Sequence, residues 1–175
     1  LNFNLRGEEI SATSSHLVNS NFDARFSCTS RSYRYIILNR SFKSPLLKNK
    51  AWLVPYKLDF TKMMKAKELF MGTYDFSAFR TLGCVAKSPV KTITKLEIMR
   101  KGEEIWIEIS APSFLYRMVR NIVGALVDVS RDYIEMQDLE NMIFKALPSK
   151  SQTAPGHGLY FLKADFKPEH LEINP

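Results

Sequence analysis

The sequence predicts an α+β fold with a largely antiparallel sheet and helices packed on one face of it. Segments with a hydrophobic period of two, typical of strands, are interspersed with segments of period 3.6, typical of helices. Two strand segments follow each other across a short turn, which favours antiparallel pairing. With 175 residues, 45% of them hydrophobic, the chain is long enough to bury one core.

Alternating apolar and polar side chains define the expected strands. Lys101-Gly102 separates two alternating segments, so these two should form a hairpin. Another segment is rich in Tyr and Ile, and a weaker one lies near the N-terminus. The expected strands are Ile10–Val18, Ser32–Asn39, Val90–Arg100, Glu104–Ser110 and Leu159–Phe166.

Apolar residues at helical spacing define three expected helices. Asp59 is a suitable N-cap for the first of them, and Gly72 is a stop signal behind it. Pro148 ends the third, because proline cannot continue a helix. The expected helices are Phe60–Met71, Ser113–Val129 and Met136–Leu147.

The protein is basic, with 25 Lys and Arg residues against 18 Asp and Glu residues. The excess lies in residues 1–100, which hold 17 basic and 7 acidic residues. Residues 22–50 alone carry seven basic residues and one acidic residue, Asp23. This distribution is typical of nucleic-acid-binding proteins. A solvated basic face without a partner explains the charge equally well.

Several classes of protein do not fit the composition. Cys28 and Cys84 are too few for a disulfide scaffold or a cysteine-based zinc site, and the three histidines are scattered, so no metal site is expected. No apolar run is long enough to span a bilayer, and low cysteine usage favours a cytoplasmic location. The chain starts at Leu1 without an initiator methionine, which suggests a fragment or a processed protein.

Arginine and aromatic residues alternate in two neighbouring segments, Phe22-Asp-Ala-Arg-Phe26 and Arg31-Ser-Tyr-Arg-Tyr35. On a strand, Tyr33 and Tyr35 share one face and Arg34 lies on the other. Aromatic rings stack on unpaired bases and arginines bind phosphates, so the pattern suits RNA. Alternatively, both tyrosines are core residues of the strand.

The expected helix Ser113–Val129 carries Arg117, Arg120 and Gly124 on one stripe. Arg120 borders the apolar side, where a guanidinium needs a carboxylate or phosphate partner. Gly124 costs helix stability relative to alanine, which suggests close packing at that position. A structural ion pair at the helix edge is the alternative to a functional arginine.

Taken together, six segments resemble the tRNA pseudouridine synthase A family, and they occur in the order and spacing of that family. The resemblance extends from Leu1 to Phe166. The six segments are Phe22–Phe26, Arg31–Ile37, Gly72–Arg80, Cys84–Pro89, Phe114–Gly124 and Thr153–Tyr160.

The resemblance implies the pseudouridine synthase fold, with two lobes around a central cleft. It also implies a cofactor-free isomerase that converts uridine to pseudouridine in the anticodon stem-loop of tRNA, acting as a homodimer that binds tRNA across both subunits. By position, Tyr33 matches the tyrosine that stacks on the target base and acts in proton transfer. Arg120 matches the arginine that pairs with the catalytic aspartate, and Leu159 matches the leucine beside the base.

The resemblance further implies a set of RNA contacts. Lys87 replaces an arginine of some relatives, which keeps the charge but loses bidentate geometry. The expected RNA-binding residues are Phe22, Asp23, Ala24, Arg25, Phe26, Arg34, Arg80, Gly83, Cys84, Val85, Ala86 and Lys87.

The chain departs from the family in one respect. The catalytic aspartate of the family lies in an Arg-Thr-Asp-x-Gly motif, which is absent here, since Arg80-Thr81 is followed by Leu82. We expect a remnant of the N-terminal lobe and the inter-lobe segment at residues 1–30, the C-terminal pseudouridine synthase domain at 31–167 and a tail at 168–175. We also expect no activity of the chain alone. The alternative is a basic module that binds tRNA without catalysis.

Overall fold

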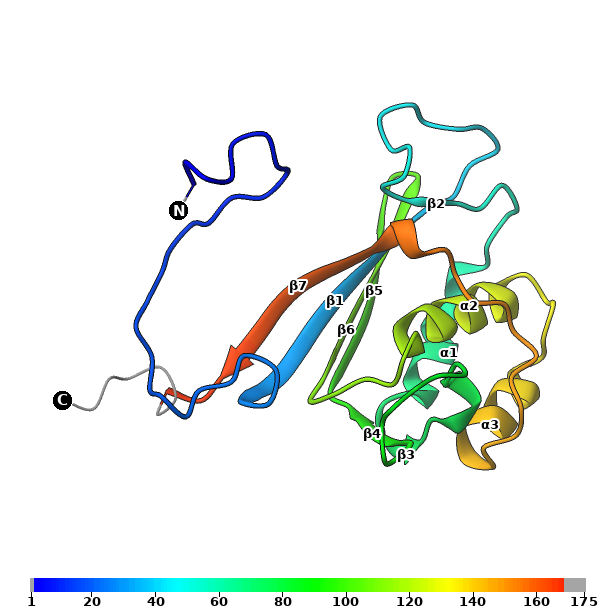
Figure 1. The fold of residues 1–175 in the computed structure, drawn as a ribbon. Coiled ribbons are helices and arrows are strands. Elements are labelled where there is room, and N and C mark those ends of the chain that lie inside the picture. The colour runs from blue at the N-terminus through cyan, green and yellow to red at the C-terminus, as the bar shows by residue number, and fades with distance from the viewer. Residues whose placement is uncertain (1, 169–175) are drawn as a thin grey trace. The chain divides into compact units, whose positions relative to one another are not determined.

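The computed structural model describes residues 2–168 (Figure 1). The chain divides into two compact units, Leu1–Thr29 with Phe166–Pro175, and Ser30–Asp165. The second unit carries the three α-helices of Figure 1 and most of every strand. Residues 169–175 of the expected tail lie outside the described residues.

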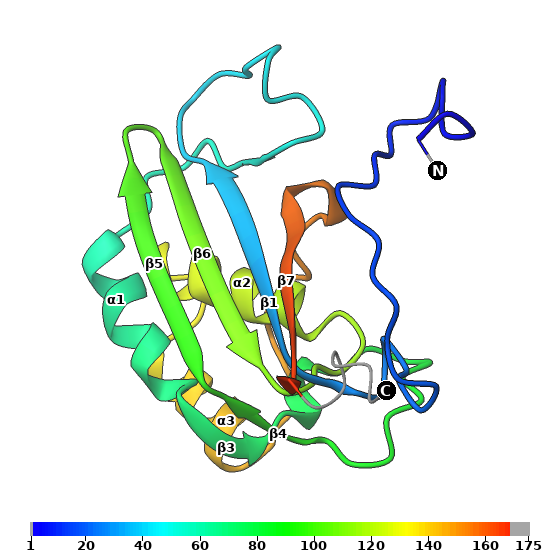
Figure 2. The same ribbon diagram turned by 90° about the vertical axis from the view of Figure 1, so that its left-hand side faces the viewer.

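The main sheet is built around β1 (Cys28–Leu38), which has neighbours on both sides. β6 (Glu104–Ala111) runs antiparallel to β1, and β5 (Lys95–Lys101) runs antiparallel to β6. The short β2 (Trp52–Leu53) is parallel to the end of β1, and the last strand, β7 (Leu159–Phe166), also pairs with β1. Figure 2 shows β5, β6, β1 and β7 side by side. The predicted hairpin and the predicted final strand are therefore confirmed.

A second, two-stranded sheet consists of β3 (Gly72–Asp75) and β4 (Val90–Ile93), which are antiparallel. The prediction of one continuous strand over Val90–Arg100 was wrong. Thr94 interrupts it, because its backbone N–H and its hydroxyl both donate to the Ser110 carbonyl, at 3.0 Å each. The residues before Thr94 therefore pair with β3 and the residues after it pair with β6, so the two parts belong to different sheets.

The sequence signals for helix ends are borne out at α1 (Phe60–Leu69). The Asp59 carboxylate accepts a hydrogen bond from the Lys62 backbone N–H at 3.0 Å, as an N-cap does. Gly72 has a φ of 114°, which side chains disfavour, so the helix cannot continue through it. Helix α3 (Met136–Phe144) stops before the predicted Leu147, because Ala146 adopts a left-handed φ of 51°.

Helix α2 (Met118–Ser130) begins five residues later than predicted. Arg117 immediately before it has φ 60° and ψ 10°, the left-handed conformation, which ends the helical geometry on its N-terminal side. Arg117 therefore does not continue the helical stripe of Arg120 and Gly124. Twelve of the thirteen residues of α2 are buried.

The core forms between the sheet and the helices. In β6, Ile105, Ile107 and Ile109 are buried and alternate with partly exposed residues, as expected for a strand with one covered face. They belong to one apolar cluster with Ile122 and Leu126 of α2. In Figure 1 the helices α1, α2 and α3 lie to the right of the strands β1, β5, β6 and β7.

The first unit contains turns rather than the predicted strand Ile10–Val18, so that prediction was wrong. Ile10 and Leu17 are exposed, and the Ala12 backbone exchanges hydrogen bonds with the Asn2 side chain, at 2.8 Å each way. No strand within residues 2–27 is available to pair with this segment, and an unpaired strand is not stable in water.

Candidate active site

A small pocket of about 100 Å³ brings together the three predicted catalytic residues. Tyr33 comes from the middle of β1, Arg120 from the first turn of α2, and Leu159 is the first residue of β7. Although they are far apart in sequence, the sheet pairing of β7 with β1 and the packing of α2 place them around one cavity. Its lining is Tyr33, Phe114, Leu115, Arg117, Met118, Val119, Arg120 and Leu159.

Tyr33 lies at the pocket within a group of aromatic rings. Its ring meets Phe114 and Phe161 edge-on, with centroids 5.3 Å away in both cases. Phe161 on β7 is 58% exposed, so this aromatic group borders solvent. Such a wall of rings is suited to hold a flat apolar surface such as that of a nucleobase.

Tyr35, two residues further along β1, is a core residue instead. Its side chain is fully buried, and its hydroxyl donates to the Pro155 carbonyl at 2.7 Å. Burial raises the pKa of Tyr35 above its ordinary value, although the neighbouring Arg120 guanidinium acts in the opposite direction. Of the two tyrosines, Tyr35 is therefore a core residue of the strand, whereas Tyr33 lines the pocket.

Arg120 is held by a loop rather than by an acid. Its Nε donates to the Ala154 carbonyl at 2.6 Å, and the Ala154 N–H donates back to the Arg120 carbonyl at 3.2 Å. Within residues 2–168, no carboxylate lies within 4.0 Å of the guanidinium nitrogens. A structural ion pair at this helix edge, the alternative considered above, is therefore not present in this part of the chain.

Asn121, next to Arg120, connects two loops. It is 92% buried, since only 8% of its surface is exposed. Its amide nitrogen donates to the Phe79 carbonyl at 2.8 Å and lies 3.3 Å from the Thr81 hydroxyl. Its amide oxygen accepts from the Thr153 hydroxyl at 2.7 Å. One buried side chain thus fixes the start of the loop after Phe79 against the segment that leads to Leu159.

Two glycines allow this segment to approach the helix and the sheet. A Cβ on Gly124 would lie 1.8 Å from the Gln152 carbonyl oxygen, a distance that no real structure permits. A Cβ on Gly158 would lie 2.7 Å from the Tyr35 ring. The close packing predicted for Gly124 is confirmed, and its partner is the backbone of the segment before Leu159.

The predicted RNA-binding loop from Arg80 to Lys87 is folded around its own arginine. Arg80 Nη2 donates to the Cys84 carbonyl at 2.6 Å and to the Ala86 carbonyl at 3.2 Å. The Tyr116 backbone N–H donates to the Cys84 sulfur at 3.3 Å. This bond, a second one from Ala86 and the nearby Arg80 charge hold the pKa of the Cys84 thiol below its usual value.

The same loop exposes several of the other predicted RNA-binding residues. Gly83 adopts a left-handed φ of 82°, and Val85 and Lys87 are exposed to solvent. Tyr116, which anchors the loop, adjoins Arg117 of the pocket lining. The loop therefore lies beside the pocket, with its tip available to a ligand.

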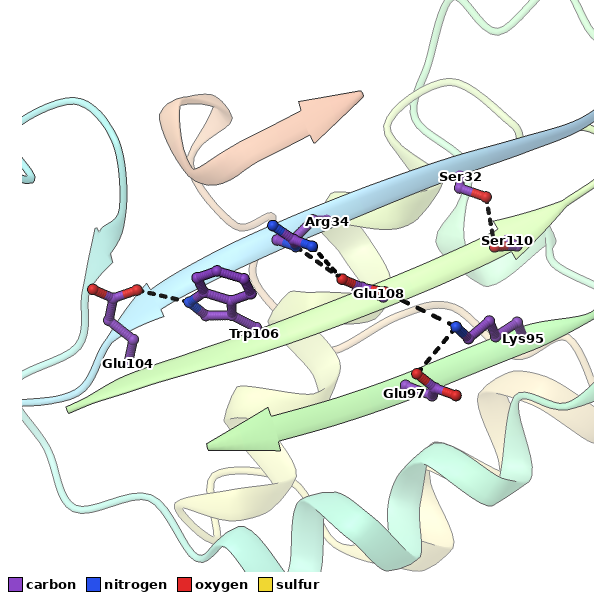
Figure 3. A network of polar contacts seen from close by, with 8 residues as sticks. All are labelled: Ser32, Arg34, Lys95, Glu97, Glu104, Trp106, Glu108 and Ser110. Carbon is purple, nitrogen blue, oxygen red and sulfur yellow. Dashed lines mark hydrogen bonds and ion pairs between the residues drawn. The ribbon is translucent and has the colours of Figure 1, made fainter. Parts of the chain in front are cut away.

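Arg34 lies on the face of β1 opposite Tyr33, as predicted, and joins a network of charged and polar side chains (Figure 3). Its Nε and Nη2 both donate to one oxygen of Glu108, at 2.9 and 2.6 Å. Its guanidinium carbon lies 4.1 Å from the centroid of the Trp106 ring. The structure therefore does not bring Arg34 together with Tyr33, Arg120 and Leu159.

The predicted RNA-binding run Phe22–Phe26 belongs to the first unit. The Asp23 carboxylate accepts hydrogen bonds from the backbone of Arg25 and Phe26, at 2.8 and 2.7 Å, and so stabilises a turn. Phe22 packs edge-on against Phe166 at 5.1 Å, and Ala24 lies in the turn. The turn leaves the Phe26 ring 81% exposed.

Sequence reasoning missed Phe114, Phe161 and Asn121. Phe114 and Asn121 lie within the segment Phe114–Gly124, which also contains Arg120. From the sequence alone, however, neither an apolar residue nor an amide indicates a functional role. Arg117 was noted for its spacing, and the structure adds that it lines the pocket from outside the helix.

Two negative findings apply to the described part of the chain. Residues 2–168 contain no group of three or more His, Cys, Asp or Glu side chains arranged to hold a metal ion. None of the helices in this range combines the length and the apolar character that crossing a bilayer requires.

Comparison with known proteins identifies the family of the chain. Residues 66–167 match the family model described as tRNA pseudouridine synthase. Two relatives carry the name tRNA pseudouridine synthase A. The one from Erythrobacter litoralis (strain HTCC2594) is 38% identical over 167 residues, which is 95% of this chain and 68% of the relative. The one from Orientia tsutsugamushi (strain Ikeda) is 40% identical over 168 residues, which is 95% of this chain and 59% of the relative. The family model covers more than half of the chain, and the first relative is 38% identical with 68% of its length covered, so the chain belongs to the tRNA pseudouridine synthase family.

Proposed function

We propose that this protein, expressed from its complete gene, isomerises uridine to pseudouridine in the anticodon stem-loop of tRNA. The observation that supports this most directly is the pocket shared by Tyr33, Arg120 and Leu159. The relatives that are named tRNA pseudouridine synthase A support the same reaction class, an isomerisation.

The reaction rearranges one nucleotide without gain or loss of atoms. The bond between C1′ of the ribose and N1 of uracil breaks, and a bond between C1′ and C5 forms. The proton on C5 leaves, and N1 takes up a proton. The electron pair of the broken bond remains with the base, so the chemistry needs acid–base groups and a nucleophile but no oxidant or reductant.

The base must leave the RNA stack to react, at a cost of a few kcal/mol. In the proposed complex, the extruded uracil stacks on the Tyr33 ring and packs beside Leu159. The Tyr33 oxygen receives the C5 proton while its own hydroxyl proton passes to water, so the phenol is neutral before and after the step. The aromatic neighbours Phe114 and Phe161 fix the orientation of the Tyr33 ring, which a positioned acid–base group requires.

Arg120 pairs with the nucleophilic carboxylate and keeps it ionised. Residues 1–175 contain no Arg-Thr-Asp-x-Gly motif, so we propose that the carboxylate comes from outside this stretch and that the chain alone is inactive. The pairing would use the guanidinium donors that Ala154 leaves unoccupied, since Ala154 accepts from Nε. The protein would act in the cytoplasm as a homodimer, with tRNA contacts from both subunits.

The test is Tyr33→Phe in the protein expressed from its complete gene, which keeps the ring and removes the hydroxyl. We expect tRNA affinity to change less than threefold and turnover to fall by about 10²–10⁴, the usual contribution of a positioned acid–base group. Release of tritium from C5 of labelled uridine in tRNA measures turnover, and filter binding measures affinity.

Leu162→Ala on the same strand as Leu159 serves as the control for altered packing, because Leu162 does not line the pocket. Wild-type turnover in Tyr33→Phe would exclude the proton-transfer role. If the wild-type protein binds tRNA yet forms no pseudouridine, the non-catalytic RNA-binding module is the better description.

A further inference from the structure

Residues 39–50, in the loop between β1 and β2, carry a cluster of cations that the site described above does not use. Figure 1 shows it as a long loop beyond the end of β1. Lys43, Lys48 and Lys50 are exposed, and within residues 2–168 none of their side chains forms a hydrogen bond or an ion pair. From Asn39 to Leu58 the sequence contains no acidic residue.

This loop is held in shape although it is exposed. Arg40 donates to the Phe42 carbonyl at 2.9 Å and to the Lys43 carbonyl at 3.0 Å, and it pairs with Glu103 at 2.8 Å. The Tyr160 hydroxyl of β7 donates to the Lys50 carbonyl at 2.6 Å. Hydrogen bonds and an ion pair thus connect both ends of the loop, at Arg40 and Lys50, to the sheet. The backbone that carries the three lysines is therefore held in place.

The loop follows the strand that contributes Tyr33 to the pocket, and a hydrogen bond joins it to the strand that contributes Leu159. Lys43 and Lys48 line a cavity of about 590 Å³ together with His157, which lies two residues before Leu159. Along β1, Tyr33 and Asn39 are six residues apart, or roughly 20 Å at about 3.3 Å per residue. An RNA whose extruded base occupies the pocket would extend its phosphates over such a distance.

We infer that residues 39–50 form an RNA-binding surface, in which Lys43, Lys48 and Lys50 contact phosphates of the tRNA substrate. Unpaired ammonium groups without neighbouring acids attract a polyanion, and a fixed loop loses little conformational freedom on binding. The Phe42 ring, 65% exposed, adds an apolar face next to the cations. This inference rests on the proposed function, because it names a further contact for the same substrate.

The experiment compares two variants of equal net charge, made in the protein expressed from its complete gene. Lys43→Gln with Lys48→Gln removes two loop cations, and Lys65→Gln with Lys145→Gln removes two exposed cations of α1 and the end of α3. Binding of a tRNA transcript is measured by filter binding between 50 and 200 mM salt.

Loss of two phosphate contacts makes the slope of log affinity against log salt shallower by roughly 1.4–1.8. The ratio of wild-type affinity to variant affinity should therefore fall about tenfold between 50 and 200 mM salt. We expect this in the loop variant and not in the control variant. Turnover at saturating tRNA should stay at the wild-type value while KM rises, because the lysines do not line the pocket.

Equal slopes in the two variants would overturn the inference. It would also be overturned if the loop variant kept the wild-type slope but changed from dimer to monomer in sedimentation, since the loop would then bind a second copy. A loss of slope in a protein that forms no pseudouridine would support the RNA-binding surface and exclude the proposed reaction, so the two can fail separately.

Discussion

Arg120 is the residue whose surroundings most clearly require a partner. A guanidinium has five N–H donors, and Ala154 accepts from one nitrogen of Arg120. The side chain is partly buried, where an unpaired charge is costly, and residues 2–168 supply no carboxylate to it. A carboxylate that pairs with Arg120 would be stabilised in its ionised form, which is the form that the proposed attack on C1′ uses.

Replacing Arg120 should therefore affect turnover far more than binding. In the protein expressed from its complete gene, Arg120→Ala should lower kcat at least 100-fold, because the pKa of the partner carboxyl rises when the positive charge is removed. The affinity for tRNA should change less than threefold. The pH–rate profile checks the cause, since its acidic limb should move to higher pH.

Arg120→Lys is the matched control for charge. It keeps the positive charge and loses the planar fork, so its kcat should lie between those of the wild type and Arg120→Ala. If Arg120→Ala loses tRNA affinity and turnover by the same factor, the arginine binds phosphate instead.

Helix α2 both lines the pocket and holds the loops beside it. Its first turn supplies Arg120 to the pocket and Asn121 to the two flanking loops. Gly124, one turn further, admits the backbone of the segment before Leu159. The element thus positions both the pocket and the segment that leads into β7, through hydrogen bonds at one residue and a close approach at another.

Asn121→Ala should test this arrangement in the chain of residues 1–175. It leaves the Phe79 carbonyl and the Thr153 hydroxyl without their buried partner, and an unsatisfied buried group costs about 1–3 kcal/mol. We expect the free energy of unfolding, measured with urea, to fall by about 2–4 kcal/mol.

Asn141→Ala on α3 is the control, since the Asn141 side-chain oxygen is buried and accepts no hydrogen bond from the described residues 2–168. Its effect should stay below that of Asn121→Ala. Equal losses at the two positions would mean that Asn121 contributes packing volume rather than the connection between the loops.

At the scale of the whole molecule, the distribution of charge bears on whether residues 1–175 can bind RNA. The positive charge is concentrated in residues 1–100, which hold 17 basic and 7 acidic residues and include the loop 39–50 and the loop after Arg80. Phosphate contacts give an affinity that falls steeply with salt, whereas the proposed isomerisation also uses a carboxylate next to Arg120. Binding and catalysis should therefore separate in this chain.

Residues 1–175 should bind tRNA weakly, with an affinity that decreases as salt increases, and should form no pseudouridine. Filter binding between 50 and 200 mM salt and tritium release from C5 measure the two properties on one preparation. A binding curve that does not change with salt would contradict the electrostatic part, and product formation by this chain would contradict the need for an outside carboxylate.

Local sequence determined the elements whose cause lies within a few residues. Asp59 and Gly72 set the ends of α1 because a side-chain cap and a left-handed φ act on the adjacent turn. The hairpin of β5 and β6 follows from two alternating segments around Gly102, which has a φ of 61°. Tyr33, Arg120 and Leu159 were predicted as catalytic residues from resemblance to family motifs that are short and contiguous, so that prediction did not depend on the fold.

Tertiary structure decided everything that depends on distant partners. Tyr33 and Tyr35 have the same chemistry and the same face of β1, and only the loop at Pro155 and the rings of Phe114 and Phe161 assign one to the core and the other to the pocket. The break at Thr94 depends on Ser110, sixteen residues away. Burial and hydrogen bonding are properties of neighbours in space, and periodicity along a chain reports which side a residue faces but not what it meets there.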